Sequence, residues 1–207
     1  MNCLFCKKPF APSAFLLYGN PKCCPTCNEK IQKRQHPSLE SLRESYRHSL
    51  IPDRYLEIEE SLYASLAKTT AASAFKQNKP LCLHGPPGTG KTLTLAIFTQ
   101  LLNRHGVFVQ FFHYGHLASR LRAHNEELPA FCELLSTVPH LVLDDVGVET
   151  DKTGWWTSWI GDIINLRYNK RIPVSSTMND LTSVDQRICR RLCEDATVIE
   201  TKELKCT

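Results

Sequence analysis

The sequence lacks the long apolar runs that a membrane protein needs. No stretch of the 207 residues approaches the ~18 consecutive apolar residues that span a bilayer. The N-terminus has no apolar segment of the kind that forms a secretory signal. Internal repeats and low-complexity tracts are also absent from the sequence. We therefore expect a cytoplasmic globular protein rather than a membrane, secreted or repeat protein.

The sequence also has little net charge of either sign. The formal charge is +4 at pH 7, which is too small to indicate a nucleic-acid partner by itself. The basic excess is concentrated in residues 1–35, which hold a single acidic residue. Such a basic segment is compatible with contact to nucleic acid or to an acidic protein, and equally with a merely soluble surface. Hydrophobic residues make up 42% of the chain, so a folded core is expected.

Cysteine, in contrast, is abundant, and its spacing is informative. Ten cysteines in a cytoplasmic protein do not favour disulfides. Two Cys-x-x-Cys pairs near the N-terminus have the spacing of a structural zinc site, with the predicted ligands Cys3, Cys6, Cys24 and Cys27. A closed tetrahedral site would fold a domain of residues 1–35 that is too small to build its own core. The alternatives are Cys23 as a substitute ligand, or unligated cysteines in a flexible segment.

A glycine-rich segment at residues 85–92 matches the phosphate-binding loop of nucleoside triphosphatases. The apolar stretch before it predicts a strand, and the one after it predicts a helix. Backbone N–H groups of the loop would cradle the phosphates, Lys91 would neutralise them, and Thr92 would ligate Mg²⁺. The pattern therefore predicts an ATP site formed by Gly85, Pro86, Pro87, Gly88, Thr89, Gly90, Lys91, Thr92 and Leu93.

A second apolar run, residues 140–143, ends in two carboxylates and predicts a buried parallel strand. Asp144 is predicted to hold the Mg²⁺ through its water shell. Asp145 is predicted to orient or deprotonate the attacking water. The alternative is an ordinary strand that ends in capping acids.

Further strands are predicted at residues 107–112, at residues 172–179 and near residue 197. Helices are expected between the strands and over residues 54–77. Three tryptophans between residues 155 and 159 recur near helical spacing, which favours core packing. The alternation predicts an α/β fold, with a parallel sheet covered by helices on both faces.

Six stretches, in order along the chain, resemble the DnaC/IstB group of AAA+ ATPases, which includes bacterial and phage helicase loaders. They are residues 51–55, 85–92, 141–147, 163–168, 173–179 and 187–192. A polar, charged segment with breaks at Pro37 and Pro52 predicts a linker of residues 36–52. The resemblance implies an AAA+ ATPase domain of residues 53–207 without a C-terminal helical lid.

The resemblance also implies roles for residues late in the chain. Asn179, with Thr177 beside it, occupies the place of the sensor residue that contacts the γ-phosphate or the attacking water. Arg191 occupies the place of the arginine finger that acts on a neighbouring subunit, with Arg187 as the second candidate. A finger of this kind implies a nucleotide-dependent homo-oligomer or a helicase-bound ring. A solvated basic helix face is the alternative for the arginines.

Two functions follow from the resemblance. The first is loading of a DnaB-type replicative helicase onto single-stranded DNA. The second is that of an IstB-type transposition ATPase, which binds DNA and recruits a transposase. A third possibility is an adaptor that binds ATP without turnover, and the presence of Lys91, Asp144, Asp145 and Asn179 argues against it.

Contact with DNA has no sharp motif in the sequence. Residues 111–122 combine aromatic side chains with Arg120 and Arg122, which suits stacking on unpaired bases and pairing with phosphates. A buried strand followed by an exposed basic helix explains the same pattern equally well.

Overall fold

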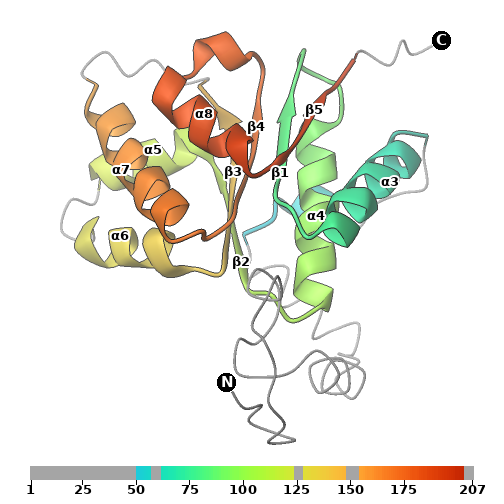
Figure 1. Cartoon of the computed structure of the whole chain (residues 1–207), viewed down its shortest axis with the longest axis horizontal. Helices are drawn as coiled ribbons and strands as arrows, with labels where there is room; N and C mark the ends of the chain where they lie inside the picture. Colours follow the sequence, from blue (N-terminus) through green and yellow to red (C-terminus); the bar gives the residue numbers. More distant parts are fainter. Residues whose placement is uncertain (1–49, 57–61, 124–127, 148–153, 203–207) are drawn as a thin grey trace, which may run out of the picture.

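The computed structural model describes residues 50–56, 62–123, 128–147 and 154–202 (Figure 1). The four cysteines of the predicted zinc site and most of the predicted linker lie outside these residues. Helices and strands alternate along the described chain. In order they are η1 (Asp53–Tyr55), α3 (Leu62–Gln77), β1 (Leu81–His84), α4 (Lys91–Arg104), β2 (Val109–His113), α5 (Tyr114–Ala123), α6 (Leu128–Thr137), β3 (His140–Val146), α7 (Trp155–Asn169), β4 (Val174–Met178), η3 (Leu181–Ser183), α8 (Gln186–Glu194) and β5 (Thr197–Glu200).

The five strands form one sheet in the order β2-β3-β4-β1-β5, and every pair is parallel. All strands therefore end at the same edge of the sheet, which is the upper edge in Figure 1. β1 lies between β4 and β5, so the loop after β1 emerges beside the ends of both. This topology confirms the predicted parallel α/β fold.

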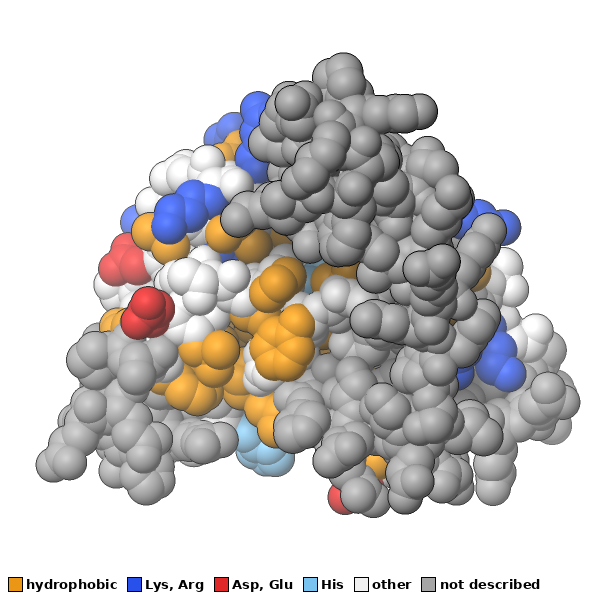
Figure 2. Space-filling view, turned by 90° about the horizontal axis from the view of Figure 1, so that it is seen from below, with side chains coloured by type: hydrophobic (Ala, Val, Ile, Leu, Met, Phe, Trp, Pro, Cys, Tyr) orange, Lys and Arg blue, Asp and Glu red, His pale blue; other side chains and the backbone are white. Residues whose placement is uncertain are grey.

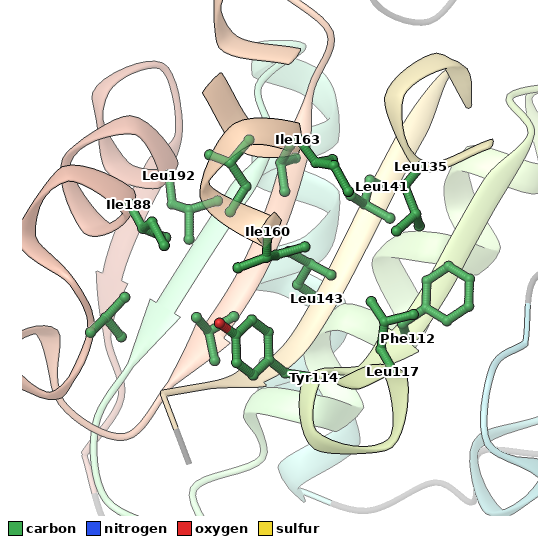
Figure 3. Close-up of a cluster of buried hydrophobic side chains, with 14 of the residues drawn as sticks. Phe112, Tyr114, Leu117, Leu135, Leu141, Leu143, Ile160, Ile163, Ile188 and Leu192 are labelled. Carbon is green, nitrogen blue, oxygen red and sulfur yellow. The ribbon is translucent and has the colours of Figure 1, made fainter. Parts of the chain in front are cut away.

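Helices cover both faces of the sheet, and each face has its own core. α3 and α4 pack on one face, and α5, α6, α7 and α8 pack on the other (Figure 1). Figure 3 shows the second core, where apolar side chains of α7 and α8 meet those of the strands. Trp156 is fully buried there, and the half-buried Trp155 and Trp159 pack against the same cluster. The prediction that the tryptophans serve the core is thereby confirmed.

Several elements differ from the sequence prediction. The helix expected over residues 54–77 corresponds to η1 and α3, and residues 57–61 lie outside the description. β2 begins at Val109, two residues later than expected. The sequence prediction did not identify α6. β4 is buried along its whole length although its middle is Ser-Ser-Thr. Burying a polar side chain costs less free energy where its hydroxyl finds a hydrogen-bond partner.

Ser175 shows how this strand accommodates polar side chains. Its hydroxyl accepts a hydrogen bond of 2.9 Å from the Leu81 N–H and lies 2.8 Å from His140 Nε2. Both partners come from neighbouring strands. Hydrogen bonds from neighbouring strands therefore offset the free-energy cost of burying the serine hydroxyl in the core.

The end of the molecule opposite to the carboxyl edge is the face seen in Figure 2. Apolar side chains gather near the middle of that view, and charged side chains lie toward its sides. The large apolar side chains that stay exposed come from separate segments: Leu50, Leu66, Phe108, Leu166 and Val198. Within the described ranges, no helix has the length and apolar character to cross a membrane.

Candidate active site

The glycine-rich loop joins the end of β1 to the start of α4. His84 is the last residue of β1, and Lys91 is the first residue of α4. The helix N-terminus, with its unpaired N–H groups and positive end, therefore points at the loop, which suits an anion. Gly90 caps this helix in the left-handed conformation, with φ of 82°. The structure thus confirms the strand–loop–helix context that the sequence predicted.

Lys91 lies beneath this loop and is only 5% exposed. Its ammonium donates hydrogen bonds of 2.7 Å to the Gly85 and Pro86 carbonyl oxygens. Burial lowers the pKa of Lys91, while Asp145 and Asp144 act in the opposite direction. The ammonium can exchange its two loop carbonyls for phosphate oxygens without leaving the loop. This donor set fits a nucleoside triphosphate.

Asp144 joins the loop to the acidic strand β3. One oxygen of its carboxylate accepts hydrogen bonds from the Thr92 hydroxyl at 3.1 Å and from the Thr177 hydroxyl at 2.7 Å. Burial raises the pKa of Asp144, and the hydrogen bond from Thr177 opposes that effect. The structure therefore brings together the two predicted Mg²⁺ ligands, Thr92 and Asp144. Their hydroxyl and carboxylate oxygens are the ligand type that Mg²⁺ prefers.

Asp145 turns away from Asp144 at the end of β3. Its φ is +58°, an uncommon conformation for a residue other than glycine. Its N–H donates to the Thr177 hydroxyl at 2.8 Å, so Thr177 is bonded to both acidic residues. Asn179 lies just beyond the end of β4 and is exposed. In this structure Thr177, rather than Asn179, is the polar residue of β4 that contacts the acidic pair.

Sequence reasoning missed His113. It is the last residue of β2, and its Nε2 lies 3.2 Å from the Asp145 carboxylate. The sequence places His113 directly after the predicted strand of residues 107–112, but only the structure shows that β2 and β3 are adjacent, with His113 opposite Asp144 in register. Polar residues at the ends of neighbouring parallel strands converge at one edge of the sheet. His113 can therefore hold the Asp145 carboxylate in place.

η1 brings an Arg-Tyr pair to the same site. The Gln100 side chain of α4 donates a hydrogen bond of 2.7 Å to the Tyr55 carbonyl oxygen. The Arg54 guanidinium lies 5.0 Å from the centre of the Tyr55 ring. Burial raises the pKa of Tyr55, Arg54 opposes the shift, and the nearby Asp144 and Asp145 add to it. The Arg-Tyr stretch that carried part of the family resemblance therefore lies beside the acidic pair.

The family model for IstB-like ATP binding proteins matches residues 43–191, which is more than half of the chain. The chain belongs to this family. Together with the loop and the acidic strand, membership identifies an ATP-binding protein and an ATPase of the AAA+ P-loop type. Among curated protein sequences, none matches the chain significantly.

Solved structures of other proteins share the fold of this family member. The DnaC helicase loader has a TM-score of 0.59 at 24% identity, over 73% of this chain and 100% of its own. DnaI has a TM-score of 0.57 at 24% identity, over 78% and 91% of the two chains. AMPPCP-bound DnaA from Aquifex aeolicus has a TM-score of 0.59 at 20% identity, over 73% and 51%. At these identities the likeness shows the fold.

The two candidate finger arginines of α8, Arg191 and Arg187, contact residues outside the phosphate-binding loop in this IstB-like protein. Arg191 lies over the ring of Tyr168, with its guanidinium carbon 6.0 Å from the ring centre. Arg187 has an 82% exposed side chain and pairs with Asp185 at 3.3 Å. The hydrogen bonds and contacts of the loop described above involve neither arginine.

The structure tests only the aromatic part of the predicted DNA-contact segment, residues 111–122. Phe111, Phe112 and Tyr114 are buried in the two cores, so their rings are not available for stacking on bases. The side chains of Arg120 and Arg122 lie outside the description. For the aromatic residues the structure therefore supports the alternative, a buried strand.

Of the two predicted metal sites, the Mg²⁺ site lies within the described residues and the zinc site lies outside them. The zinc-site residues Cys3, Cys6, Cys24 and Cys27 cannot be placed, because they precede the described part of the chain. Across the described ranges there is no group of three or more His, Cys, Asp or Glu residues that could hold a metal ion. A Mg²⁺ bound between Thr92 and Asp144 would therefore depend on ATP oxygens and water for its remaining ligands.

Proposed function

We propose that this ATPase uses ATP and Mg²⁺ to load a DnaB-type replicative helicase onto single-stranded DNA. The observation that supports the catalytic part is the convergence of Lys91, Thr92 and the acidic pair at one edge of the sheet. The likeness to the DnaC helicase loader supports the loading part, since that solved chain is matched over its whole length. The transposition function gains no specific support from the site.

The residues of the site have separate roles in this proposal. Loop N–H groups and Lys91 bind the phosphates, and Thr92 with Asp144 holds the Mg²⁺. Asp145 accepts a proton from the attacking water or orients it, and His113 keeps the Asp145 carboxylate in position. Asn179, two residues after Thr177 and just beyond the end of β4, has the role of contacting the γ-phosphate or the attacking water in this proposal.

Assembly completes the site in the proposal. Arg191 of one subunit stabilises the charge on the phosphoryl group transferred in the next subunit, with Arg187 as the second candidate. Arg191 lies over Tyr168 of its own α7 and takes no part in the described contacts of its own loop, so the proposal assigns it to the loop of a neighbouring subunit. Hydrolysis therefore depends on a nucleotide-dependent homo-oligomer or a helicase-bound ring.

The N-terminal segment has a different task in the proposal. Cys3, Cys6, Cys24 and Cys27 bind one Zn²⁺, which folds residues 1–35 into a small domain that grips the helicase. Elemental analysis of reduced, purified protein should find one zinc per chain. Cys6→Ser should lose the metal and helicase binding but keep ATP binding. Cys132→Ser, which changes a half-buried free thiol of the ATPase domain, is the matched control and should keep the zinc.

The loading function can be tested with the full chain. A DnaB-type helicase, ATP, and circular single-stranded DNA that carries an annealed oligonucleotide and is coated with single-strand-binding protein should release the oligonucleotide only when this protein is added. The Lys91→Ala variant should give none. If the protein leaves the helicase inactive yet recruits a transposase to duplex DNA, the loader proposal is wrong and the transposition function replaces it.

A further inference from the structure

A threonine beyond the last strand contacts the phosphate-binding loop. Thr201 follows β5, and its N–H donates a hydrogen bond of 2.7 Å to the His84 carbonyl oxygen. This bond continues the parallel pairing of β5 with β1, in which Glu200 is opposite His84. Thr201 is thereby fixed beside the residue at which the loop begins.

The backbone of Thr201 approaches the loop so closely that only glycine fits opposite it. A Cβ on Gly85 would lie 2.2 Å from the Thr201 carbonyl oxygen and 2.6 Å from its hydroxyl. The φ of Gly85 is also +138°, which a side chain would disfavour. The first glycine of the nucleotide motif therefore serves the contact with Thr201 as well as the turn of the loop.

The Thr201 hydroxyl reaches the middle of the same loop. It lies 2.7 Å from the hydroxyl of Thr89 and 3.0 Å from the His84 carbonyl oxygen. The Thr89 hydroxyl in turn lies 2.9 Å from the Pro86 carbonyl oxygen. These are three contacts, between Thr89 and Pro86, between Thr89 and Thr201, and between Thr201 and His84. The two hydroxyl groups have two protons, so two of the three contacts are hydrogen bonds at any one time.

The choice between these arrangements depends on Lys91. While the ammonium donates to the Pro86 carbonyl oxygen, that oxygen does not need the Thr89 proton. When Lys91 turns to a phosphate group, Pro86 loses this donor and the Thr89 proton satisfies it instead. The Thr201 proton can then move from the His84 carbonyl oxygen to the Thr89 hydroxyl, because the His84 carbonyl oxygen keeps the Thr201 N–H as a donor.

We propose that Thr201 is a positioning residue for the nucleotide: its hydroxyl donates to Thr89 and holds the phosphate-binding loop in the conformation that accepts a nucleoside triphosphate. Thr201 touches the loop and not the reacting atoms. It acts on binding, while the acidic residues that act on the attacking water lie on β3 and contact other partners.

Thr201→Val tests the proposal, because valine keeps the shape of the side chain and removes its hydroxyl. ATP affinity, measured with a fluorescent ATP analogue, should fall roughly three- to tenfold, the loss expected for one neutral hydrogen bond. KM for ATP should rise in parallel while kcat stays within about twofold of the wild-type value. Thr201→Ser keeps the hydroxyl and should restore affinity to within about twofold.

Three further variants separate positioning from general stability. Thr197→Val makes the same change in β5, at a hydroxyl without a hydrogen-bond partner among the described residues, and should leave ATP affinity unchanged. In a double-mutant cycle, Thr89→Val combined with Thr201→Val should bind ATP no more weakly than Thr89→Val alone, because both changes remove one contact. Thermal unfolding without nucleotide shows whether each variant is folded.

The outcomes decide the proposal. Wild-type affinity in folded Thr201→Val overturns it, and so does an equal loss in the serine and valine variants. Additive losses in the cycle also overturn it, since the two hydroxyls would then act independently. The proposal is supported if Thr201→Val weakens ATP binding, Thr201→Ser binds ATP nearly as well as the wild type, and Thr201→Val causes no further loss when Thr89→Val is already present.

Discussion

The strands β3 and β4 bury ionisable side chains at both of their ends, and the two ends differ in what surrounds those groups. At the amino end, Arg167 of α7 is fully buried and donates hydrogen bonds of 2.8 Å to the Leu135 and Pro173 carbonyl oxygens. His140, the first residue of β3, is also fully buried. At the carboxyl end, Lys91 and Asp144 are buried beside the glycine-rich loop. Burial of a charge therefore does not by itself identify an active site.

The two ends differ in the freedom of their polar partners. Arg167 is bonded to carbonyl groups that cap α6 and begin β4, and these cannot be exchanged without opening the fold. Lys91 is bonded to carbonyls of a loop, and Asp144 is bonded to two hydroxyl groups that can rotate. β4 supplies both ends, with Ser175 beside His140 and Thr177 beside Asp144. The polar groups at the amino end therefore keep their hydrogen-bond partners, whereas those at the carboxyl end can exchange their partners for a ligand.

The largest effect is expected from Lys91→Ala at the carboxyl end. Removing the ammonium leaves no other cation in the loop to neutralise the phosphates, so ATP binding should be abolished. Equilibrium binding of a fluorescent ATP analogue measures this directly, and Lys91→Arg gives a matched control that keeps the charge. Affinity close to wild type in a folded Lys91→Ala protein would contradict the assigned role.

The second effect concerns the arginine that would reach this end from another subunit. Arg191→Ala should bind ATP normally and lower hydrolysis by about 10³-fold or more, the range found for arginine fingers. Asp145→Asn should also spare binding and stop turnover.

Mixing the two inactive proteins tests the geometry. Some interfaces in the mixture pair an intact finger with an intact acidic strand, so part of the activity should return. If both variants co-assemble and nothing returns, Arg191 does not act in trans and the role passes to Arg187 or to no residue of α8. Arg187→Ala, assayed in the same way, distinguishes these cases.

The third effect belongs to the amino end. Arg167→Met should lower the free energy of unfolding by roughly 2–4 kcal/mol, because it removes both hydrogen bonds of the buried guanidinium and leaves the Leu141 N–H as the remaining donor to Pro173. ATP affinity should stay within about twofold, since the hydrogen bonds of Arg167 go to Leu135 and Pro173, which are not residues of the site. Denaturant unfolding and ATP titration of the same sample give both values. If Arg167→Met lowered ATP affinity without lowering the free energy of unfolding, the amino end would take part in ATP binding and the contrast between the two ends would be wrong.

The smallest effect is a pH dependence at His140. Burial, with Arg167 adding to it, lowers the pKa of His140 to about 3. The unfolded chain takes up this proton below its ordinary pKa of about 6.5, so stability falls as pH drops from there toward 3. The loss should reach about 2 kcal/mol at pH 5. His140→Gln should remove this part of the acid sensitivity, which parallel denaturant curves at pH 7 and pH 5 would detect.

The sequence was sufficient for the parts of the site whose residues are neighbours along the chain. The loop of residues 85–92 needs glycines, a lysine and a helix start in one order, and the pattern appears directly in the sequence. The apolar run that ends in Asp144 and Asp145 predicted a buried strand in the same way. Alternation of apolar segments predicted the parallel sheet, because hydrophobic periodicity is a local property.

The contacts of His113, Thr177 and Thr201 were decided by the tertiary structure alone. His113 meets Asp145 because β2 and β3 are adjacent, and Thr177 meets both acids because β4 is their other neighbour. Thr201 meets Thr89 because β5 pairs with β1. Histidine and threonine are common on surfaces and in strands, so their types reveal nothing until strand order makes them neighbours. Strand order depends on packing between segments distant in the chain, and local sequence patterns do not contain it.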